Sequence, residues 1–240
     1  MKITTNFILF LMLLFMLSCK EKIKDEDQFV IYQVSPNKGN VRLYWKNNDH
    51  TILRSIARLK KEVEARNETL LFAMNGGMFE PDNSPKGLYI ENFKLLKSID
   101  TLKGNGNFYL PPNGIFYLTK NNQAVIVETQ KFRQSREIRY ATQSGPMLLM
   151  NGEINPIFQK DSKNLNIRNG VGILGNGDLL FVLSKEDISF YNLARFFKES
   201  GCKNALYLDG FVSRAYLPEK NWVQNDGDFG VMIGITAATR

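Results

Sequence analysis

Residues Asn204–Pro218 read NALYLDGFVSRAYLP and place a short apolar run directly before an Asp-Gly turn. Residues 205–208 have the pattern of a buried strand, and Asp209-Gly210 is a dipeptide typical of turns. A carboxylate at the end of a buried strand is costly unless it is paired, bound to a ligand or at the mouth of a cleft. Asp209 is therefore either a solvated turn residue or part of a site, with Ser213 and Arg214 within reach.

The composition is that of a folded globular protein. The chain has 240 residues, of which 43% are hydrophobic and 23% are charged, and this suits one large domain better than two. Many short hairpins and two helices predict the α+β class, or mixed α/β. We expect one compact domain over residues 28–240, with a large, mostly antiparallel sheet and a few helices.

Local patterns predict the individual elements. Residues 29–34 and 41–45 flank a turn-rich segment and favour a hairpin, as do residues 87–96 around Asn92 and residues 114–128. Helical spacing of apolar residues covers 51–66, with Asp49 or Thr51 as the N-cap. A second helix is expected from Ser189 to Ser200, and Gly201 is expected to end it.

Charge and rare residues exclude several kinds of chemistry. The net charge is +7, but no arginine-rich arm or basic stripe is present, so a nucleic-acid partner is not expected. The chain has one histidine, His50, and two cysteines, which are too few for a Cys/His zinc site. No cofactor is expected. Carboxylates and amide oxygens would suit Ca²⁺ or Mg²⁺, but no EF-hand-like spacing supports a metal.

The N-terminus has the features of a bacterial export signal. An apolar run over residues 7–17 is followed by Ser18-Cys19, so residues 1–18 are predicted to be a lipoprotein signal peptide. Cys19 would then carry the lipid, and residues 19–27 would form a charged tether. We expect a cell-envelope protein outside the cytoplasm whose only contact with the membrane is this anchor. The alternative is a secreted or periplasmic protein in which Cys19 is incidental.

Polar residues flanked by glycine stand beside four apolar strands. Glycine lets a backbone approach a ligand closely, so four such clusters together suggest one cleft built from loops. The clusters are Asn75-Gly76-Gly77, Gln143-Ser144-Gly145-Pro146, Arg168-Asn169-Gly170 and Asp209-Gly210.

The same segments resemble the phosphodiester glycosidase family. The motifs are FAMNGGMF at 72–79, QSGPML at 143–148, RNGVG at 168–172 and ALYLDG at 205–210. Their order and approximate spacing agree with the family over roughly residues 70–235. The chain departs from the family at Phe211, where a second glycine is usual.

The resemblance implies hydrolysis of a sugar-1-phosphodiester. Arg168 would hold the phosphate with its planar fork, and Asp209 would stabilise positive charge at the anomeric carbon. A nearby Arg168 would favour the ionised form of Asp209. Glu80 and Asp228 are candidates for a second carboxylate. The expected substrate-binding residues are Asn75, Gly76, Gly77, Gln143, Ser144, Gly145, Gly210 and Ser213.

Two other functions fit the same residues. The first is a lipoprotein of the same fold that binds glycans or cell-wall polymers without turnover. The second is a structural or adaptor lipoprotein in which the glycine motifs serve only tight turns. The sequence leaves the sugar, the aglycone and the oligomeric state open.

Overall fold

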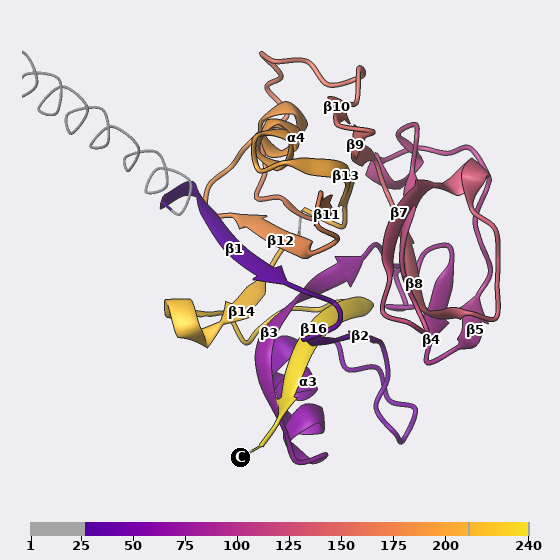
Figure 1. Cartoon of the computed structure of the whole chain (residues 1–240), viewed down its shortest axis with the longest axis vertical. Coiled ribbons are helices and arrows are strands. Elements are labelled where there is room, and N and C mark those ends of the chain that lie inside the picture. Colours follow the sequence, from indigo (N-terminus) through magenta and orange to yellow (C-terminus); the bar gives the residue numbers. More distant parts are fainter. Residues whose placement is uncertain (1–26, 211, 240) are drawn as a thin grey trace, which may run out of the picture.

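Three antiparallel sheets make up most of the protein, which is described here over residues 27–210 and 212–239 of a computed structural model (Figure 1). The expected antiparallel pairing is confirmed. The expectation of one large sheet was wrong, because the strands divide among three sheets. The described residues are mostly β, with two α-helices and three 3₁₀ turns.

The six-stranded sheet carries the strand that precedes Asp209. Helix α4 (Phe190–Glu199) packs on this sheet through Leu193 and Phe197, and Ser189 caps its first turn as expected. Gly201, with φ of 84°, follows the helix, as expected. In order, the strands are β1 (Phe29–Val34), β12 (Leu179–Ser184), β11 (Asn169–Leu174), β13 (Cys202–Tyr207), β9 (Met147–Met150) and β10 (Glu153–Ile154).

The second sheet is covered on one face by helix α3 (Ile56–Glu64), whose Ile56, Leu59 and Val63 are buried. The helix is shorter than expected and its N-cap is Ser55, because Ile52 pairs with Lys46 and Arg54 has a φ of 64°. In order, the strands are β15 (Trp222–Val223), β14 (Ala215–Leu217), β3 (Glu68–Gly77), β16 (Val231–Ala238) and β2 (Asn40–Tyr44).

The third sheet contains two of the expected hairpins. Asn92 (φ 53°) and Asn122 (φ 58°) take the left-handed conformation that asparagine tolerates in turns. In order, the strands are β5 (Lys94–Lys97), β4 (Tyr89–Glu91), β8 (Ile138–Ser144), β6 (Gly114–Thr119) and β7 (Ala124–Glu128). The 3₁₀ turns are η1 (Asn107–Tyr109), η2 (Thr129–Lys131) and η3 (Pro218–Lys220).

The hairpin expected over residues 29–45 is wrong. β1 pairs with β12 along its whole length, from Phe29 opposite Ser184 to Val34 opposite Leu179. β2 pairs instead with β16 in the second sheet. The turn is formed, since Lys38 and Gly39 both donate to the Ser35 carbonyl, but it carries the chain from one sheet to another.

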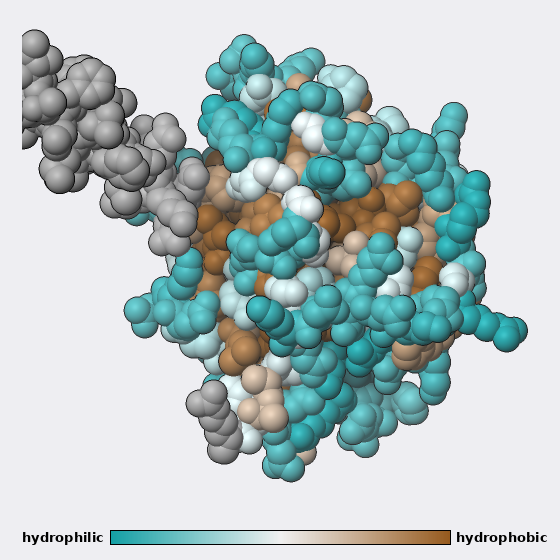
Figure 2. All heavy atoms as spheres, viewed as in Figure 1, coloured by the Kyte–Doolittle hydropathy of each residue, from teal (hydrophilic) through white to brown (hydrophobic). Residues whose placement is uncertain are grey.

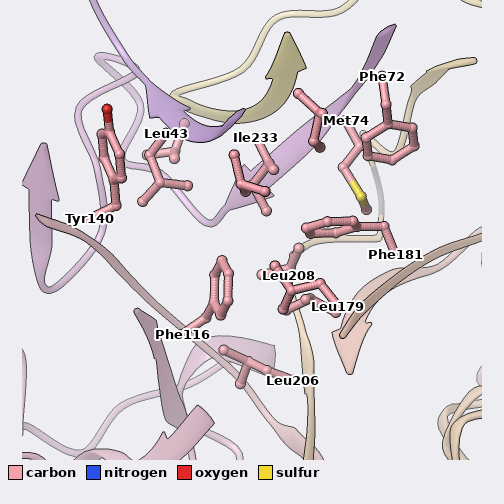
Figure 3. Close-up of a cluster of buried hydrophobic side chains, with 14 of the residues drawn as sticks. Leu43, Phe72, Met74, Phe116, Tyr140, Leu179, Phe181, Leu206, Leu208 and Ile233 are labelled. Carbon is pink, nitrogen blue, oxygen red and sulfur yellow. The ribbon is translucent and has the colours of Figure 1, made fainter. Parts of the chain in front are cut away.

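A shared hydrophobic core joins the three sheets. Side chains from all of them meet in it: Leu43, Phe72, Met74, Phe116, Phe181, Leu206, Leu208 and Ile233 (Figure 3). Burying each such side chain contributes about 1.5–3 kcal/mol, so this core fixes how the sheets sit. Figure 2 shows a largely hydrophilic surface with hydrophobic residues across the middle of the face. Within the described residues, no helix is long and apolar enough to cross a membrane.

Candidate active site

Asp209 lies just beyond β13, beside the first residue of β11. Its backbone N–H donates to the Asn169 side-chain oxygen Oδ1 at 2.9 Å. The preceding residue, Leu208, donates its N–H to the Asn169 carbonyl at 3.4 Å. The pairing of β11 and β13 is therefore extended by the Asn169 side chain, which bonds to the Asp209 backbone where that residue leaves the sheet.

Asn75, near the end of β3, completes this arrangement from the second sheet. Its Nδ2 donates to the Asp209 carbonyl at 3.0 Å. Its Oδ1 accepts from Asn169 Nδ2 at 2.8 Å and from the Arg214 N–H at 3.1 Å. Both asparagines are fully buried. We call these two amides and the Asp209 and Arg214 backbone that they bind the asparagine network; it holds Asp209 from two sheets.

Two serines secure the same segment. Ser213 Oγ donates to the Asp209 carbonyl at 2.6 Å, and Ser144 Oγ donates to the Leu208 carbonyl at 2.7 Å. Both serines are buried. These two candidate binding residues therefore fix the backbone around Asp209.

The candidate glycines allow close backbone packing. A Cβ at Gly210 would lie 1.9 Å from the Tyr207 hydroxyl, and one at Gly145 would lie 2.7 Å from the Phe108 carbonyl oxygen. Gly76 and Gly77 end β3, opposite the start of β16. The atoms that approach these four glycines most closely belong to this chain itself.

Gln143 does not join the asparagine network. Its Oε1 accepts from the N–H groups of Leu88 and Asp100, both at 2.9 Å, and its Nε2 donates to the Asp100 carbonyl at 2.6 Å. Successive residues of a strand point to opposite faces, so Gln143 and Ser144 on β8 diverge. The Gln143 amide holds the loop after β5, whereas Ser144 reaches Leu208.

Arg168 diverges from Asn169 in the same way. The guanidinium is fully buried and stacks 3.6 Å from the centre of the Phe190 ring. Its Nε donates to the Ile188 carbonyl at 2.8 Å, and Nη2 donates to the carbonyl and the side chain of Asn164 at 2.9 and 3.1 Å. Four of its five N–H groups are thus used within the protein, because Nη1 also donates to the Tyr207 hydroxyl at 3.4 Å.

The link from Arg168 to Asp209 passes through Tyr207. The Tyr207 hydroxyl contacts the Arg168 guanidinium on one side and accepts from the Gly210 backbone on the other. Burial raises the pKa of the Tyr207 hydroxyl well above its usual value, so this group stays protonated. The Asp209 carboxyl also acts electrostatically on the Tyr207 hydroxyl, so these two side chains are neighbours.

The electrostatics of Asp209 differ from the expectation. Desolvation by burial raises the pKa of its carboxyl to about 7, and only a hydrogen bond from the Gly210 backbone opposes this rise. The expected lowering by Arg168 is absent because the guanidinium faces Tyr207. Arg214, close in sequence, pairs with Asp226 at 3.0 Å. The raised pKa keeps more of the Asp209 carboxyl protonated near neutral pH than an exposed aspartate would be.

The two further carboxylates lie in loops next to the end of β3. Glu80 pairs with Lys86 at 3.6 Å. Asp228 pairs with Arg54 at 3.3 Å and accepts from Asn83 Nδ2 at 3.1 Å. The β-strand that follows Asp228 begins at Val231, opposite Gly77. Neither carboxylate is bonded to the asparagine network.

Asn169 and Tyr207 were not among the site residues expected from the sequence. Asn169 belonged to one of the glycine clusters, but the adjacent Arg168 was chosen as the site residue because it is charged. Tyr207 read as part of an apolar strand, and nothing in that pattern marked its hydroxyl as a neighbour of Arg168 and Gly210. Among residues 27–210 and 212–239, no group of three or more His, Cys, Asp or Glu side chains could hold a metal. Phe211 and Cys19 lie outside the described residues.

Comparisons with known proteins agree with the motifs. The family described as phosphodiester glycosidase matches residues 68–235. A protein of Escherichia coli K12, the uncharacterized YigE, is 36% identical over 187 residues, or 78% of this chain and 73% of that protein.

Two solved structures share the fold at low sequence identity. One is the zebrafish N-acetylglucosamine-1-phosphodiester alpha-N-acetylglucosaminidase catalytic domain, auto-inhibited by its pro-peptide, with a TM-score of 0.61 and 16% identity over 87% of this chain and 82% of that one. A second is the crystal structure of a protein from Burkholderia pseudomallei, with a TM-score of 0.57 and 10% identity over 86% of this chain and 73% of that one.

Proposed function

The chain belongs to the phosphodiester glycosidase family, and on this basis we propose that it hydrolyses a sugar-1-phosphodiester with Asp209 at the reacting centre. The proposal rests on one observation. The Asp209 carboxyl is desolvated, and its backbone is held in place by hydrogen bonds. Carboxyl groups with strongly shifted pKa values concentrate at functional sites.

The proposed reaction breaks the bond between the anomeric carbon and the phosphate oxygen. Water supplies a hydroxyl to the sugar and a proton to the solution, and the phosphate stays on its partner as a monoester. The Asp209 carboxylate stabilises the positive charge that develops at the anomeric carbon. Because Asn75, Asn169 and Ser213 already fix its backbone, little reorganisation is needed in the transition state.

The other candidates take narrower roles in this proposal. Arg168 acts as a positioning residue, through Tyr207 and the backbone of Gly210. Glu80 and Asp228 remain candidates for a second carboxylate, since glycosidases usually use two. A phosphate is a good leaving group, so strong acid assistance is not required.

A paired substrate panel tests the reaction. We expect the purified protein to release free sugar from methyl esters of sugar 1-phosphates at least 100-fold faster than from the matching methyl glycosides, which lack the phosphate. Released reducing sugar and methyl phosphate would be measured together. Equal cleavage of the phosphate-free glycosides would contradict the substrate class. Binding of the phosphodiesters without any release would favour the non-catalytic glycan-binding alternative.

We also propose that the protein is anchored outside the cytoplasm through Cys19. The support is the apolar run that ends at Ser18-Cys19. Replacement of Cys19 by alanine is expected to leave unprocessed precursor or to release the domain from membranes, as measured by fractionation and immunoblotting. Unchanged processing and membrane association would favour the secreted or periplasmic alternative.

A further inference from the structure

A polar cavity lies at the junction of the second and third sheets. Its volume is about 310 Å³, and its exposed members Arg66 and Asn92 connect it to solvent. The cavity begins where β3 begins, at Glu68, whereas Asn75 stands near the other end of that strand. At about 3.3 Å per residue, the two places are about 23 Å apart. The lining residues are Arg42, Leu43, Tyr44, Arg66, Glu68, Glu91, Asn92, Arg139 and Tyr140.

The hydroxyl of Tyr44 is the most informative group in this cavity. Tyr44 is only 3% exposed, and its O–H has no acceptor among the described residues. Arg42 approaches the Tyr44 oxygen as a donor, and Glu68 and Tyr140 also act electrostatically on this hydroxyl, which places it among the polar lining groups. A buried hydroxyl whose hydrogen has no acceptor destabilises the folded state. A bound acceptor would remove that cost.

Arg139 supplies a second set of donors. Its guanidinium lies 5.1 Å from the centre of the Tyr140 ring and donates to the Tyr140 side chain, but it makes no ion pair with any residue in 27–210 or 212–239. Arginine carries five N–H donors and no acceptor. Its planar fork suits two oxygens of a carboxylate or phosphate.

The two glutamates of the cavity are already engaged. Both oxygens of Glu68 accept from Arg42, each at 2.9 Å. Glu91 accepts from the Tyr89 hydroxyl at 2.5 Å, and burial raises the pKa of its carboxyl. The groups that lack partners are therefore donors, and three arginines face two glutamates.

From these donors we propose that the cavity between β2, β3, β4 and β8 is a binding site for a small oxyanion. Arg139 binds two of its oxygens, and the Tyr44 hydroxyl donates to the anion from the buried end. Arg66, which also pairs with Glu62 at 2.6 Å, adds positive charge at the entrance. This site is separate from the proposed hydrolytic centre and does not depend on its activity.

Thermal unfolding in the presence of inorganic phosphate tests the site. A ligand that binds only the folded state raises the unfolding temperature in a saturable way. We expect this with sodium phosphate, at an ionic strength kept constant with sodium chloride. A parallel titration with sodium acetate distinguishes a phosphoryl site from a carboxylate site, according to which anion saturates at lower concentration.

Two variants and two controls locate the effect. Arg139→Gln and Tyr44→Phe are each expected to weaken the apparent affinity for the anion at least fivefold. Tyr44→Phe removes only the hydroxyl, so without anion its stability is expected to equal or exceed that of the wild type. The matched control is Arg136→Gln, an exposed arginine on the segment before β8, which is expected to keep wild-type affinity. Asp209→Asn is also expected to keep it.

The proposal is overturned if neither anion gives a saturable shift with the wild-type protein. It is equally overturned if Arg139→Gln and Tyr44→Phe both retain the full shift. Loss of the shift in Asp209→Asn alone would place the anion at the hydrolytic centre and would also overturn the second site.

Discussion

Replacement of Asp209 by asparagine is expected to reduce turnover of a sugar-1-phosphodiester by at least 100-fold, about 2.7 kcal/mol of transition-state free energy. Asparagine has nearly the shape of aspartate but cannot carry a negative charge. The Asp209 backbone keeps its bonds to Asn75, Asn169 and Ser213, so the fold is expected to survive. Steady-state kinetics and circular dichroism on the same preparation would separate the two effects.

The same variant has a defined effect on stability. The pKa of Asp209 is raised from 3.8 to about 7 in the folded protein, so the folded state holds a proton that the unfolded state has lost between these values. The contribution of Asp209 to the stability of the wild type therefore falls as pH rises from about 4 to about 7. We expect Asp209→Asn to be more stable than the wild type at pH 8, with the difference shrinking towards pH 4.

The proposed role also fixes the direction of the pH–rate profile. If the ionised carboxylate stabilises positive charge, kcat/KM rises through a midpoint near pH 7 in the wild type, because that is where Asp209 loses its proton. Asp161→Asn, at an exposed position, is the control for nonspecific charge effects. If Asp209→Asn is fully active and its stability depends on pH as in the wild type, Asp209 is only a turn residue. If kcat/KM of the wild type instead falls with rising pH through this midpoint, Asp209 acts as a general acid.

Replacement of Arg168 by lysine is expected to cost about 2 kcal/mol of stability and at least tenfold in activity. Lysine keeps the positive charge but lacks the planar fork that reaches Asn164, Ile188 and Tyr207 together. Stacking on Phe190 would be weakened as well. Denaturant unfolding and kinetics would measure both losses.

The kinetic pattern distinguishes two roles for this arginine. A positioning role predicts that kcat falls while KM changes little, since the guanidinium acts through Tyr207. A phosphate clamp predicts that KM rises for phosphodiesters as well. Arg195→Lys, on the exposed side of α4, is the matched control and is expected to be silent. Unchanged stability and activity in Arg168→Lys would contradict both roles.

Local chemistry made part of the fold predictable from the sequence. Ser189 and Gly201 bound α4, and Asn92 and Asn122 form hairpin turns, because caps and turns depend on neighbouring residues. The pairing of β1 depends on a strand about 150 residues away, which no local pattern can reveal. For the same reason, the division into three sheets was not foreseen.

The site was predictable at the level of segments but not of side chains. Asn75, Ser144 and Asp209, which come from three of the four glycine clusters, lie close together, and Ser213 joins them. The motifs could not say which member of each adjacent pair faces Asp209, because strand phase is set by the packing of whole sheets. Its charge made Arg168 the expected site residue. In the structure, the alternation of side chains along the strand directs its neighbour Asn169 towards Asp209 instead.

The asparagine network also bears on how the protein folds. It joins positions 40, 94 and 134 residues apart along the chain. Contacts of such separation must overcome a large loop-closure entropy and are associated with slow folding. No hairpin or single sheet contains the network, so it cannot form before the sheets dock. During synthesis, β3 and β11 leave the ribosome first and must wait for residue 209, which makes the proposed reacting centre one of the last parts of the molecule to take shape.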